Sequence, residues 1–462
     1  MTVRGKAYIA GIFEHPTRLA PDKTVAQLHA EVALGALADA GLTREDVDGY
    51  FCSGDAPGPG PWYCRPAARQ WRCPPPAADA SAFHANLPGY RPTALRELPA
   101  LAGELRVGRV FVTDESARLG LPAFKVLGAS WAVARIMAGS AAPTDAAPAS
   151  TAPAAAASAG AAPADAGPRP AAGAATGDRT VAGLRRAAAA RPVELVTATD
   201  GNHGRAVAWM SRLLGLRARV FVPWAVPAGA RAGIVGEGAA VTVVDGSYDR
   251  AVERAAAYAV AGPARVLVQD SAWPGYEQVP GWIVEGYGTL LREVDAQLAG
   301  CGLPGPGLVS VPVGVGSLAQ AVVAHYRSRP RESGSPGPAV QAVEPESAAC
   351  LLASLQAGAP RSVPTPGTVM AGLDCGTVSG LAWPVLAAGL DAATAVPDRA
   401  ATRAAADLGR LGVSSGPSGA ASLAGVRAAL TGPGARRRRD DLAVTASSVL
   451  VLLSTEGSAA AG

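Results

Sequence analysis

The stretch Leu121-Pro122-Ala123-Phe124-Lys125-Val126-Leu127-Gly128 places one amine inside an apolar run. Of the 41 Lys and Arg residues in the chain, only Lys6, Lys23 and Lys125 are lysines. A guanidinium stays protonated in proteins, whereas a desolvated lysine can lose its proton and attack a carbonyl. We therefore interpret Lys125 as a Schiff-base lysine; the alternative is a lysine at a helix end whose ammonium reaches solvent.

The residues around this stretch predict the fold class. Residues 126–137 are apolar on nearly all sides, which predicts a buried helix. Short strands then alternate with helices, and this alternation is typical of parallel sheets covered by helices on both faces, with ligands at the carboxyl ends of the strands. We expect strands at 110–112, 194–198, 219–223, 240–244, 265–269, 308–312, 340–343 and 449–453. We expect helices at 203–214, 248–260, 279–298, 318–327, 347–356 and 418–430.

The N-terminal region has a different organisation. Residues 7–13 and 46–52 are expected to form strands, with an amphipathic helix at 25–40 between them, so that 1–58 form a short βαβ-like fragment. A Gly/Pro cluster follows, and residues 59–81 are expected to form a Pro-rich linker. We assign 82–462 to the main domain.

A low-complexity Ala/Pro/Ser/Gly tract interrupts the main domain at 139–178. This composition cannot build a packed core, so we expect a disordered surface insertion there.

Composition excludes several classes of function. Net charge is +4 with a pI of about 8.8, which is too mild for a nucleic-acid binding protein. The one basic run, 436–439, is followed at once by Asp440 and Asp441, so we expect a solvated loop. The six cysteines lack zinc spacing, and no metal site is expected. No secretory leader or membrane span is evident, which indicates a cytoplasmic location.

Two polar turns follow predicted strands and open predicted helices. Val313-Gly314-Val315-Gly316-Ser317 can direct backbone N–H groups at an anion, although a plain βα turn is equally compatible with it. Asp200-Gly201-Asn202-His203 has the same context; Asn202 caps the helix or binds a ligand, and Asp200 is placed to exchange protons. Asp270 follows another strand, and the hydroxyls of Ser454 and Thr455 end the last one.

Together, one amine, one anion-binding Gly turn and several polar groups at strand ends are the requirements of pyridoxal phosphate. The aldehyde needs the lysine, the phosphate needs the turn and helix, and the ring needs flanking hydrogen bonds.

Ordered motifs extend this pattern over about residues 62–457, apart from the insertion. They are Phe83-His84, Leu87-Pro88-Gly89-Tyr90, the run 114–128, Ala198 to Arg205, Val268-Gln269-Asp270, Gly275-Tyr276, the run 282–287, Val313 to Leu318, Glu344-Pro345-Glu346, Met370 to Gly376, and Ser454-Thr455-Glu456-Gly457.

These motifs resemble diaminopropionate ammonia-lyase, a fold-type-II pyridoxal phosphate family related to the threonine dehydratases. The resemblance implies a two-subdomain, tryptophan synthase β-like α/β architecture, a small amino-acid substrate and a homodimer. It implies that Lys125 forms the internal Schiff base, that Asn202 binds the ring hydroxyl, and that Ser454 or Thr455 faces the pyridine nitrogen. By the same resemblance, the phosphate would be held by Gly314, Val315, Gly316 and Ser317.

The expected reaction is elimination of 2,3-diaminopropionate to pyruvate and two ammonia. The resemblance implies that Asp200 serves the D-isomer, Lys125 serves the L-isomer, and Asp270 is a second active-site carboxylate. Two alternatives stay open: a threonine or serine dehydratase-like enzyme, and a degenerate, non-catalytic fusion protein.

Residues 1–58 resemble a different family, the start of a sterol-carrier-type thiolase. The motifs are Arg4 to Gly11, Ala38 to Leu42, and Asp46 to Tyr50. The likeness stops near Gly58, and the nucleophilic cysteine of the thiolases has no counterpart downstream. We therefore expect no thiolase activity.

Overall fold

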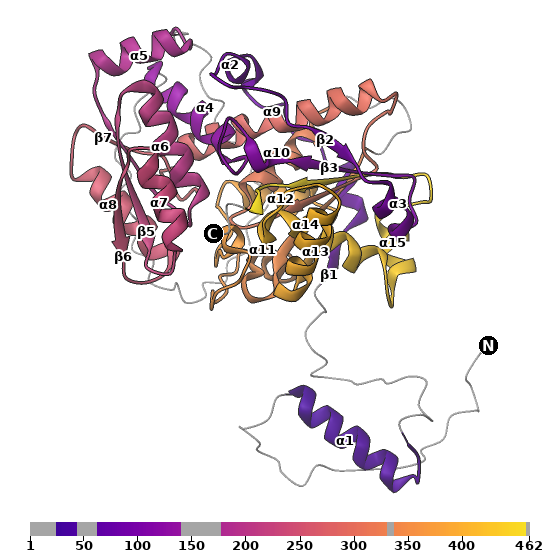
Figure 1. Ribbon diagram of the computed structural model, residues 1–462. Helices are drawn as coiled ribbons and strands as arrows, with labels where there is room; N and C mark the ends of the chain where they lie inside the picture. The colour runs from indigo at the N-terminus through magenta and orange to yellow at the C-terminus, as the bar shows by residue number, and fades with distance from the viewer. Residues whose placement is uncertain (1–24, 44–61, 140–176, 330–336, 459–462) are drawn as a thin grey trace, which may run out of the picture. The chain divides into compact units, whose positions relative to one another are not determined.

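The computed structural model describes residues 25–43, 62–139, 177–329 and 337–458 (Figure 1). By their contacts the residues form two units, Met1–Gly60 and Pro61–Gly462. In the first unit the described part contains one helix, α1 (Val25–Asp39), which matches the helix expected at 25–40. The strands expected at 7–13 and 46–52 lie outside the described residues, as do residues 140–176 of the expected insertion.

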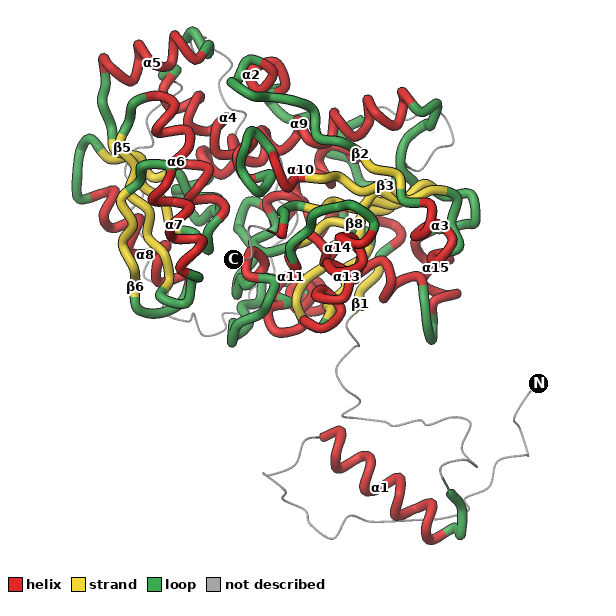
Figure 2. Tube along the Cα trace, in the orientation of Figure 1, coloured by secondary structure: helices red, strands yellow, loops and turns green. Residues whose placement is uncertain are grey.

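The larger unit contains two sheets that lie side by side (Figure 2). The first has seven strands in the order β1-β10-β9-β8-β11-β3-β2; its five central strands are parallel, and β1 and β2 pair antiparallel at the two edges. Its strands are β1 (Trp62–Cys64), β2 (Leu95–Glu97), β3 (Arg109–Asp114), β8 (Leu308–Pro312), β9 (Ala339–Pro345), β10 (Ala392–Val396) and β11 (Val449–Ser454).

The second sheet has four strands, all parallel, in the order β6-β5-β4-β7. They are β4 (Glu194–Ala198), β5 (Arg217–Pro223), β6 (Ala240–Val244) and β7 (Arg265–Leu267). Every residue of β4, β8 and β9 is buried, as expected where helices cover both faces of a parallel sheet.

Helices cover both sheets, and α4 and α9 pack against each other in the region between them (Figure 1). The α-helices of this unit are α2 (Ser81–Ala85), α3 (Pro99–Leu105), α4 (Lys125–Met137), α5 (Val181–Ala190), α6 (Asn202–Leu214), α7 (Ala228–Gly236), α8 (Tyr248–Val260), α9 (Gln278–Gly300), α10 (Ser317–Arg327), α11 (Cys350–Ala357), α12 (Ala382–Gly389), α13 (Asp398–Arg410), α14 (Pro417–Leu430) and α15 (Ala435–Leu442). Short 3₁₀ turns occur at η2 (Pro66–Gln70), η3 (Glu115–Ala117), η4 (Glu346–Ala348) and η5 (Ala371–Leu373).

This architecture confirms the predicted fold class, an α/β protein with two parallel-rich sheets. Two local expectations differ. The basic run at 436–439 is not a loop but part of α15, where Arg438 and Arg439 donate to the carbonyls of Ala429 and Leu430 at the end of α14. Residues 62–70, expected in an irregular linker, form β1 and η2, because Arg69 is tied into the core by a 2.7 Å ion pair with the buried Asp391.

Among the described residues, no helix combines the length and the apolar character that crossing a bilayer requires.

Candidate active site

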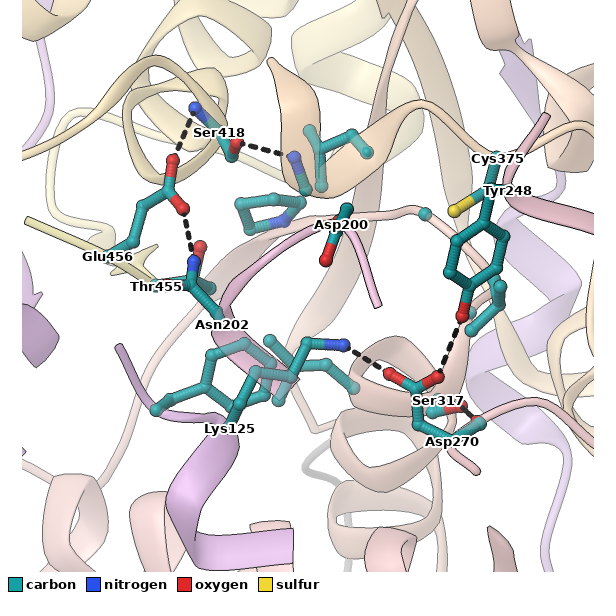
Figure 3. Close-up of a pocket in the computed structure, with 18 residues that line it drawn as sticks. Lys125, Asp200, Asn202, Tyr248, Asp270, Ser317, Cys375, Ser418, Thr455 and Glu456 are labelled. Atoms are coloured by element: carbon teal, nitrogen blue, oxygen red, sulfur yellow. Dashed lines mark hydrogen bonds and ion pairs between the residues drawn. The ribbon is translucent and has the colours of Figure 1, made fainter. Parts of the chain in front are cut away.

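The two sheets direct the carboxyl ends of their strands at one pocket (Figure 3). Asp200 follows β4 and Asp270 follows β7, both from the four-stranded sheet. From the seven-stranded sheet, β8 leads into the glycine turn before α10, and β11 leads into Thr455 and Glu456. Lys125 enters the pocket from the first residue of α4, between the two sheets.

The segment before Lys125 is fixed by backbone pairing with the end of β11. Phe124 N donates to Thr455 O at 3.1 Å, and Gly457 N donates to Pro122 O at 2.9 Å. Ala123 forms an isolated antiparallel bridge with Glu456. The lysine backbone therefore has a fixed register relative to the residues that end β11.

The position of helix α4 also depends on a hydrogen bond from His84 and on two glycines at its contact with α9. Burial lowers the pKa of His84 to about 3, so the ring is neutral; because a carbonyl only accepts, Nε2–H donates to Leu127 O at 2.9 Å. Gly128 and Gly286 lie where α4 crosses α9. A Cβ on Gly128 would come within 2.6 Å of the Tyr287 ring, so a larger residue would push the lysine helix outward.

Lys125 and Asp270 form an ion pair, with Nζ 2.6 Å from Oδ2. Burial by itself lowers the pKa of Lys125, but the Asp270 carboxylate outweighs it and the net pKa is raised above its usual value. Burial likewise raises the pKa of Asp270, but Lys125 outweighs it and the pKa falls well below its usual range. Burial alone favours the neutral amine, as expected from the sequence, and the Asp270 carboxylate opposes this effect by favouring the protonated form.

Asp270 has further partners that fix its carboxylate. Oδ1 accepts from the hydroxyl of Tyr248 at 3.2 Å and from Gln269 Nε2 at 3.2 Å. Its backbone carbonyl accepts from Ser317 Oγ at 2.8 Å. This last bond joins the four-stranded sheet to the first residue of α10, so the carboxylate and the glycine turn keep a fixed spacing.

Asp200 is the second carboxylate of the pocket and differs from Asp270. Burial raises its pKa to about 6, with the Lys125 charge opposing this rise and the Asp270 charge adding to it. Among the described residues it forms no ion pair, and its Oδ1 accepts from the Thr199 hydroxyl at 3.4 Å. A carboxylate with a pKa near 6 can accept and return a proton close to neutral pH.

A third buried carboxylate, Glu456, lies at the other side of the pocket. Its Oε2 accepts from Asn202 Nδ2 at 2.8 Å, and its Oε1 accepts from Ser418 N at 3.2 Å, in the first turn of α14. Burial raises its pKa above the usual value. The bonds to Asn202 and Ser418 are drawn as dashed lines in Figure 3.

The glycine turn presents its backbone to the same pocket. Gly316 has φ +96°, and a Cβ there would lie 3.0 Å from Leu386 Cδ1; a Cβ on Gly314 would lie 3.0 Å from Cys375 Sγ. Within the part of the chain that the structure describes, no acceptor pairs with the backbone N–H groups of residues 314–318. These donors and the N-terminus of α10 together form a cradle for an anion.

The pocket brings most of the sequence-predicted site residues together. It is lined by Lys125, Asp200, Asn202, Asp270, Gly314, Val315, Gly316, Ser317 and Thr455. Ser454 lies outside it: the side chain is fully buried, and its hydroxyl donates to Ser415 Oγ at 2.8 Å.

Sequence reasoning did not select Tyr248 or Glu456, which also line the pocket. The sequence does contain an indication for Glu456, because this residue follows the two hydroxyl residues at the end of β11. Tyr248 opens a helix and follows β6 only after a short loop, so little in the sequence marks it as a site residue.

The residues present fit pyridoxal phosphate. The amine of Lys125 faces the pocket and could bond to the aldehyde, and the amide of Asn202 could bind the ring hydroxyl. The backbone N–H groups of the glycine turn could bind the phosphate.

Comparison with known proteins agrees with this geometry. Residues 173–447 match the family model described as pyridoxal-phosphate dependent enzyme. The diaminopropionate ammonia-lyase of Salmonella typhimurium is 35% identical over 311 residues, covering 66% of this chain and 68% of that protein.

Two crystal structures of the Escherichia coli diaminopropionate ammonia-lyase superpose on the chain. The complex with an aminoacrylate-PLP azomethine reaction intermediate has a TM-score of 0.67 and the complex with D-serine one of 0.68; each is 29% identical and covers 82% of this chain and 88% of that one. The chain therefore belongs to the pyridoxal-phosphate dependent enzymes and, within them, to the diaminopropionate ammonia-lyase family.

Proposed function

We propose that this enzyme converts 2,3-diaminopropionate, as the D-isomer, the L-isomer or both, to pyruvate and two ammonia with uptake of one water. The observation that carries the proposal is the pairing of Lys125 with Asp270 beside a separate carboxylate, Asp200, whose pKa is about 6. When bound, pyridoxal phosphate supplies an aldehyde for the substrate amine and an electron sink for the electrons left at Cα.

The chain's own residues would hold the cofactor at four points. Lys125 meets the aldehyde, and Asn202 Nδ2 donates to the ring hydroxyl oxygen. Residues 314–317 bind the phosphate through their N–H groups. Thr455 is the candidate for the ring nitrogen, because it lines the pocket whereas the hydroxyl of Ser454 points to Ser415.

Two groups are available to take the Cα proton. Asp200 accepts it from the D-isomer and Lys125 from the L-isomer, after substrate has freed the amine. Asp270 stabilises the positive charge on Lys125 whenever the amine is protonated, and it can stabilise the departing β-ammonium in the same way.

Asp200 also discriminates against the dehydratase alternative. An enzyme restricted to L-amino acids needs only the lysine as base, so a second buried carboxylate with an elevated pKa would have no function there. A non-catalytic fusion protein would not be expected to keep an amine, two carboxylates and an open anion cradle in one pocket.

The test is pyruvate release from D- and L-diaminopropionate compared with L-threonine and L-serine. We expect turnover of at least one diaminopropionate isomer to exceed that of both hydroxy amino acids. Faster turnover of threonine would overturn the choice of substrate, and the absence of pyruvate from all four would overturn the enzymatic proposal.

The cytoplasmic location and the homodimer belong to the same proposal. The five cysteines in the described residues are free thiols, which suits a reducing compartment. Analytical ultracentrifugation of the full chain tests the homodimer. The likeness of residues 1–58 to a thiolase start stays a prediction, and assay of that activity in the full chain should find none.

A further inference from the structure

Glu456 brings a buried carboxyl group into the pocket, and both of its oxygens accept hydrogen bonds. Its side chain is 6% exposed, and no Lys, Arg or His among the described residues forms an ion pair with it. One oxygen accepts from Asn202 Nδ2 at 2.8 Å and the other from Ser418 N at 3.2 Å. Each oxygen of Glu456 therefore has an N–H donor of its own.

This arrangement decides which way the amide of Asn202 points. The oxygen and nitrogen of an amide have nearly the same size and can exchange places by rotation. An ionised carboxylate only accepts hydrogen bonds, so beside ionised Glu456 the rotated amide would set its oxygen against the carboxylate and be repelled. The amide is thus fixed with Nδ2 at Glu456, and the second Nδ2–H remains for an acceptor in the pocket.

The same residue fixes the amide relative to the lysine. Glu456 forms the bridge with Ala123, two residues before Lys125, and its neighbour Thr455 accepts from Phe124 N. The hydroxyl and the aldehyde of pyridoxal phosphate occupy adjacent ring carbons, so the groups that meet them must keep a fixed spacing. The segment Thr455-Glu456 thus contacts the residues before Lys125 through its backbone, and it contacts Asn202 through the carboxylate of Glu456.

We propose that Glu456 is a positioning residue for the cofactor: by holding Nδ2 of Asn202, it makes that amide present a hydrogen-bond donor to the ring hydroxyl oxygen of pyridoxal phosphate. The inference rests on the proposed contact between Asn202 and that oxygen, and it gives Glu456 a role that its bond to Ser418 does not require.

The competing explanation is that Glu456 only caps α14. Glu344 provides the matched control, because it is a fully buried carboxylate that accepts from Leu351 N at 2.7 Å and Leu352 N at 2.8 Å in the first turn of α11. It does not line the pocket. Glu344→Gln should therefore reproduce the loss of a cap without the loss of a pocket contact.

The experiment is a double-mutant cycle on the full chain with added pyridoxal phosphate. Glu456→Gln, Asn202→Ala, the double variant and Glu344→Gln are compared by equilibrium dialysis, by the visible band of the bound cofactor, and by thermal melting. Glu456→Gln should weaken cofactor binding roughly tenfold, as expected when a charged hydrogen-bond partner is lost, and should shift the band. Asn202→Ala should do the same, and the double variant should be no worse than either single one.

Glu344→Gln should lower the melting temperature and leave the band unchanged. Additive losses in the double variant, or an unchanged band and affinity in Glu456→Gln, would overturn the positioning role. If Glu456→Gln does not fold, Glu456→Asp replaces it, because aspartate keeps a carboxylate on a shorter side chain. Cofactor binding that is weakened by Glu456→Asp in the parent chain but not in the Asn202→Ala variant supports the proposal. Equal losses of cofactor affinity in the parent chain and in the Asn202→Ala variant reject it. None of these readouts depends on diaminopropionate turnover, so the proposed reaction and this inference can fail separately.

Discussion

The two sheets bring different kinds of chemistry to one pocket. The four-stranded sheet contributes ionisable and polar side chains, with Asp200 after β4 and Asp270 after β7. From the seven-stranded sheet, the turn after β8 contributes backbone N–H groups, and its glycines pack closely against neighbouring residues of the protein. The two buried aspartates and the glycine turn thus come from different sheets, and Lys125 lies on the helix between them.

The aspartates and the glycine turn meet two different chemical requirements, proton transfer and anion binding. Proton transfer needs groups whose pKa is set by burial and neighbouring charge, as for Asp200 and Asp270. Anion binding needs unpaired N–H groups and a helix N-terminus, which do not titrate. Variants of Asp200 and Asp270 should therefore change turnover and its pH dependence, and variants of the glycine turn after β8 should change cofactor affinity.

The largest effect is expected at Lys125, on which both sides depend. Lys125→Arg keeps the charge beside Asp270, but a guanidinium neither bonds covalently to the aldehyde nor releases a proton. Pyruvate release should fall by at least about a thousandfold for both isomers, because the variant loses both the covalent bond to the aldehyde and a proton-transfer residue, which alone contributes about 10²–10⁴-fold. Arg186→Lys is the control, because it exchanges the same two residue types in the opposite direction at an exposed position; it should leave turnover unchanged. Residual turnover of Lys125→Arg above a tenth of the parent value would remove Lys125 from the mechanism.

Asp200→Asn should separate the two isomers. The amide cannot accept the Cα proton, so D-diaminopropionate turnover should fall by about 10²–10⁴-fold, whereas the L-isomer keeps Lys125 as its base. Pyruvate release from each pure isomer measures this directly. Equal losses for both would mean that Asp200 positions the substrate and does not act as the base.

The pH profile tests the same carboxylate without a mutation. A base with a pKa of about 6 is ionised above that pH, so kcat/KM for the D-isomer should decline as the pH falls through about 6. The decline should approach tenfold per pH unit and should disappear from the residual activity of Asp200→Asn. A profile that is flat between pH 5 and 7 would contradict the elevated pKa.

Asp270→Asn should have a smaller effect on both isomers. Removing this partner leaves burial as the main influence on Lys125, so the pKa of the amine should fall. Losing a hydrogen bond to a charged group corresponds to about 1.5–3 kcal/mol, or roughly 10–100-fold in kcat/KM. In cofactor-free enzyme, the amine should react faster with an amine-modifying reagent at neutral pH; an unchanged rate would show that Asp270 does not control its protonation.

The parts of the fold that the sequence predicts best are short runs in which β-branched residues stand next to one another or alternate with other residues. Strands β4, β6 and β8 have the predicted bounds for this reason, although β4 and β8 are buried and β6 is largely accessible. Strand β10 was not predicted, because Ala-Ala-Thr-Ala-Val has little β propensity; it is a fully buried strand that pairs with both β1 and β9. Tertiary packing therefore decides that strand.

For the site, the order along the chain was enough to select the lysine and the strand-end groups. It could not decide between Ser454 and Thr455, because consecutive strand residues point to opposite faces and the register is set by neighbouring strands. It also could not find the pairing of Lys125 with Asp270, 145 positions apart, which reverses the protonation expected from burial alone.

The smallest effect is expected on the seven-stranded side, at Gly316. Its φ of +96° is rarely adopted by residues with a Cβ, and an added methyl group would also lie 3.2 Å from Ala382 Cβ. Gly316→Ala should cost about 1–3 kcal/mol of backbone strain and contact. If the cradle absorbs part of that strain by moving, cofactor affinity should fall about tenfold, while the pH profile of the residual activity keeps its shape.

Gly409→Ala is the matched control, because Gly409 lies within α13 with no heavy atom within 4 Å of an added Cβ and no positive φ. That change should stabilise the protein by about 0.5–1 kcal/mol through helix propensity and leave cofactor binding untouched. Equilibrium dialysis measures the cofactor affinity of the two variants, and melting curves measure their stability. The two variants thus compare a glycine-to-alanine change in the anion cradle with the same change in an ordinary helix. A shifted pH profile in Gly316→Ala would show that the backbone cradle also sets the charge of the catalytic groups, and the division of work between the two sheets would then be incomplete.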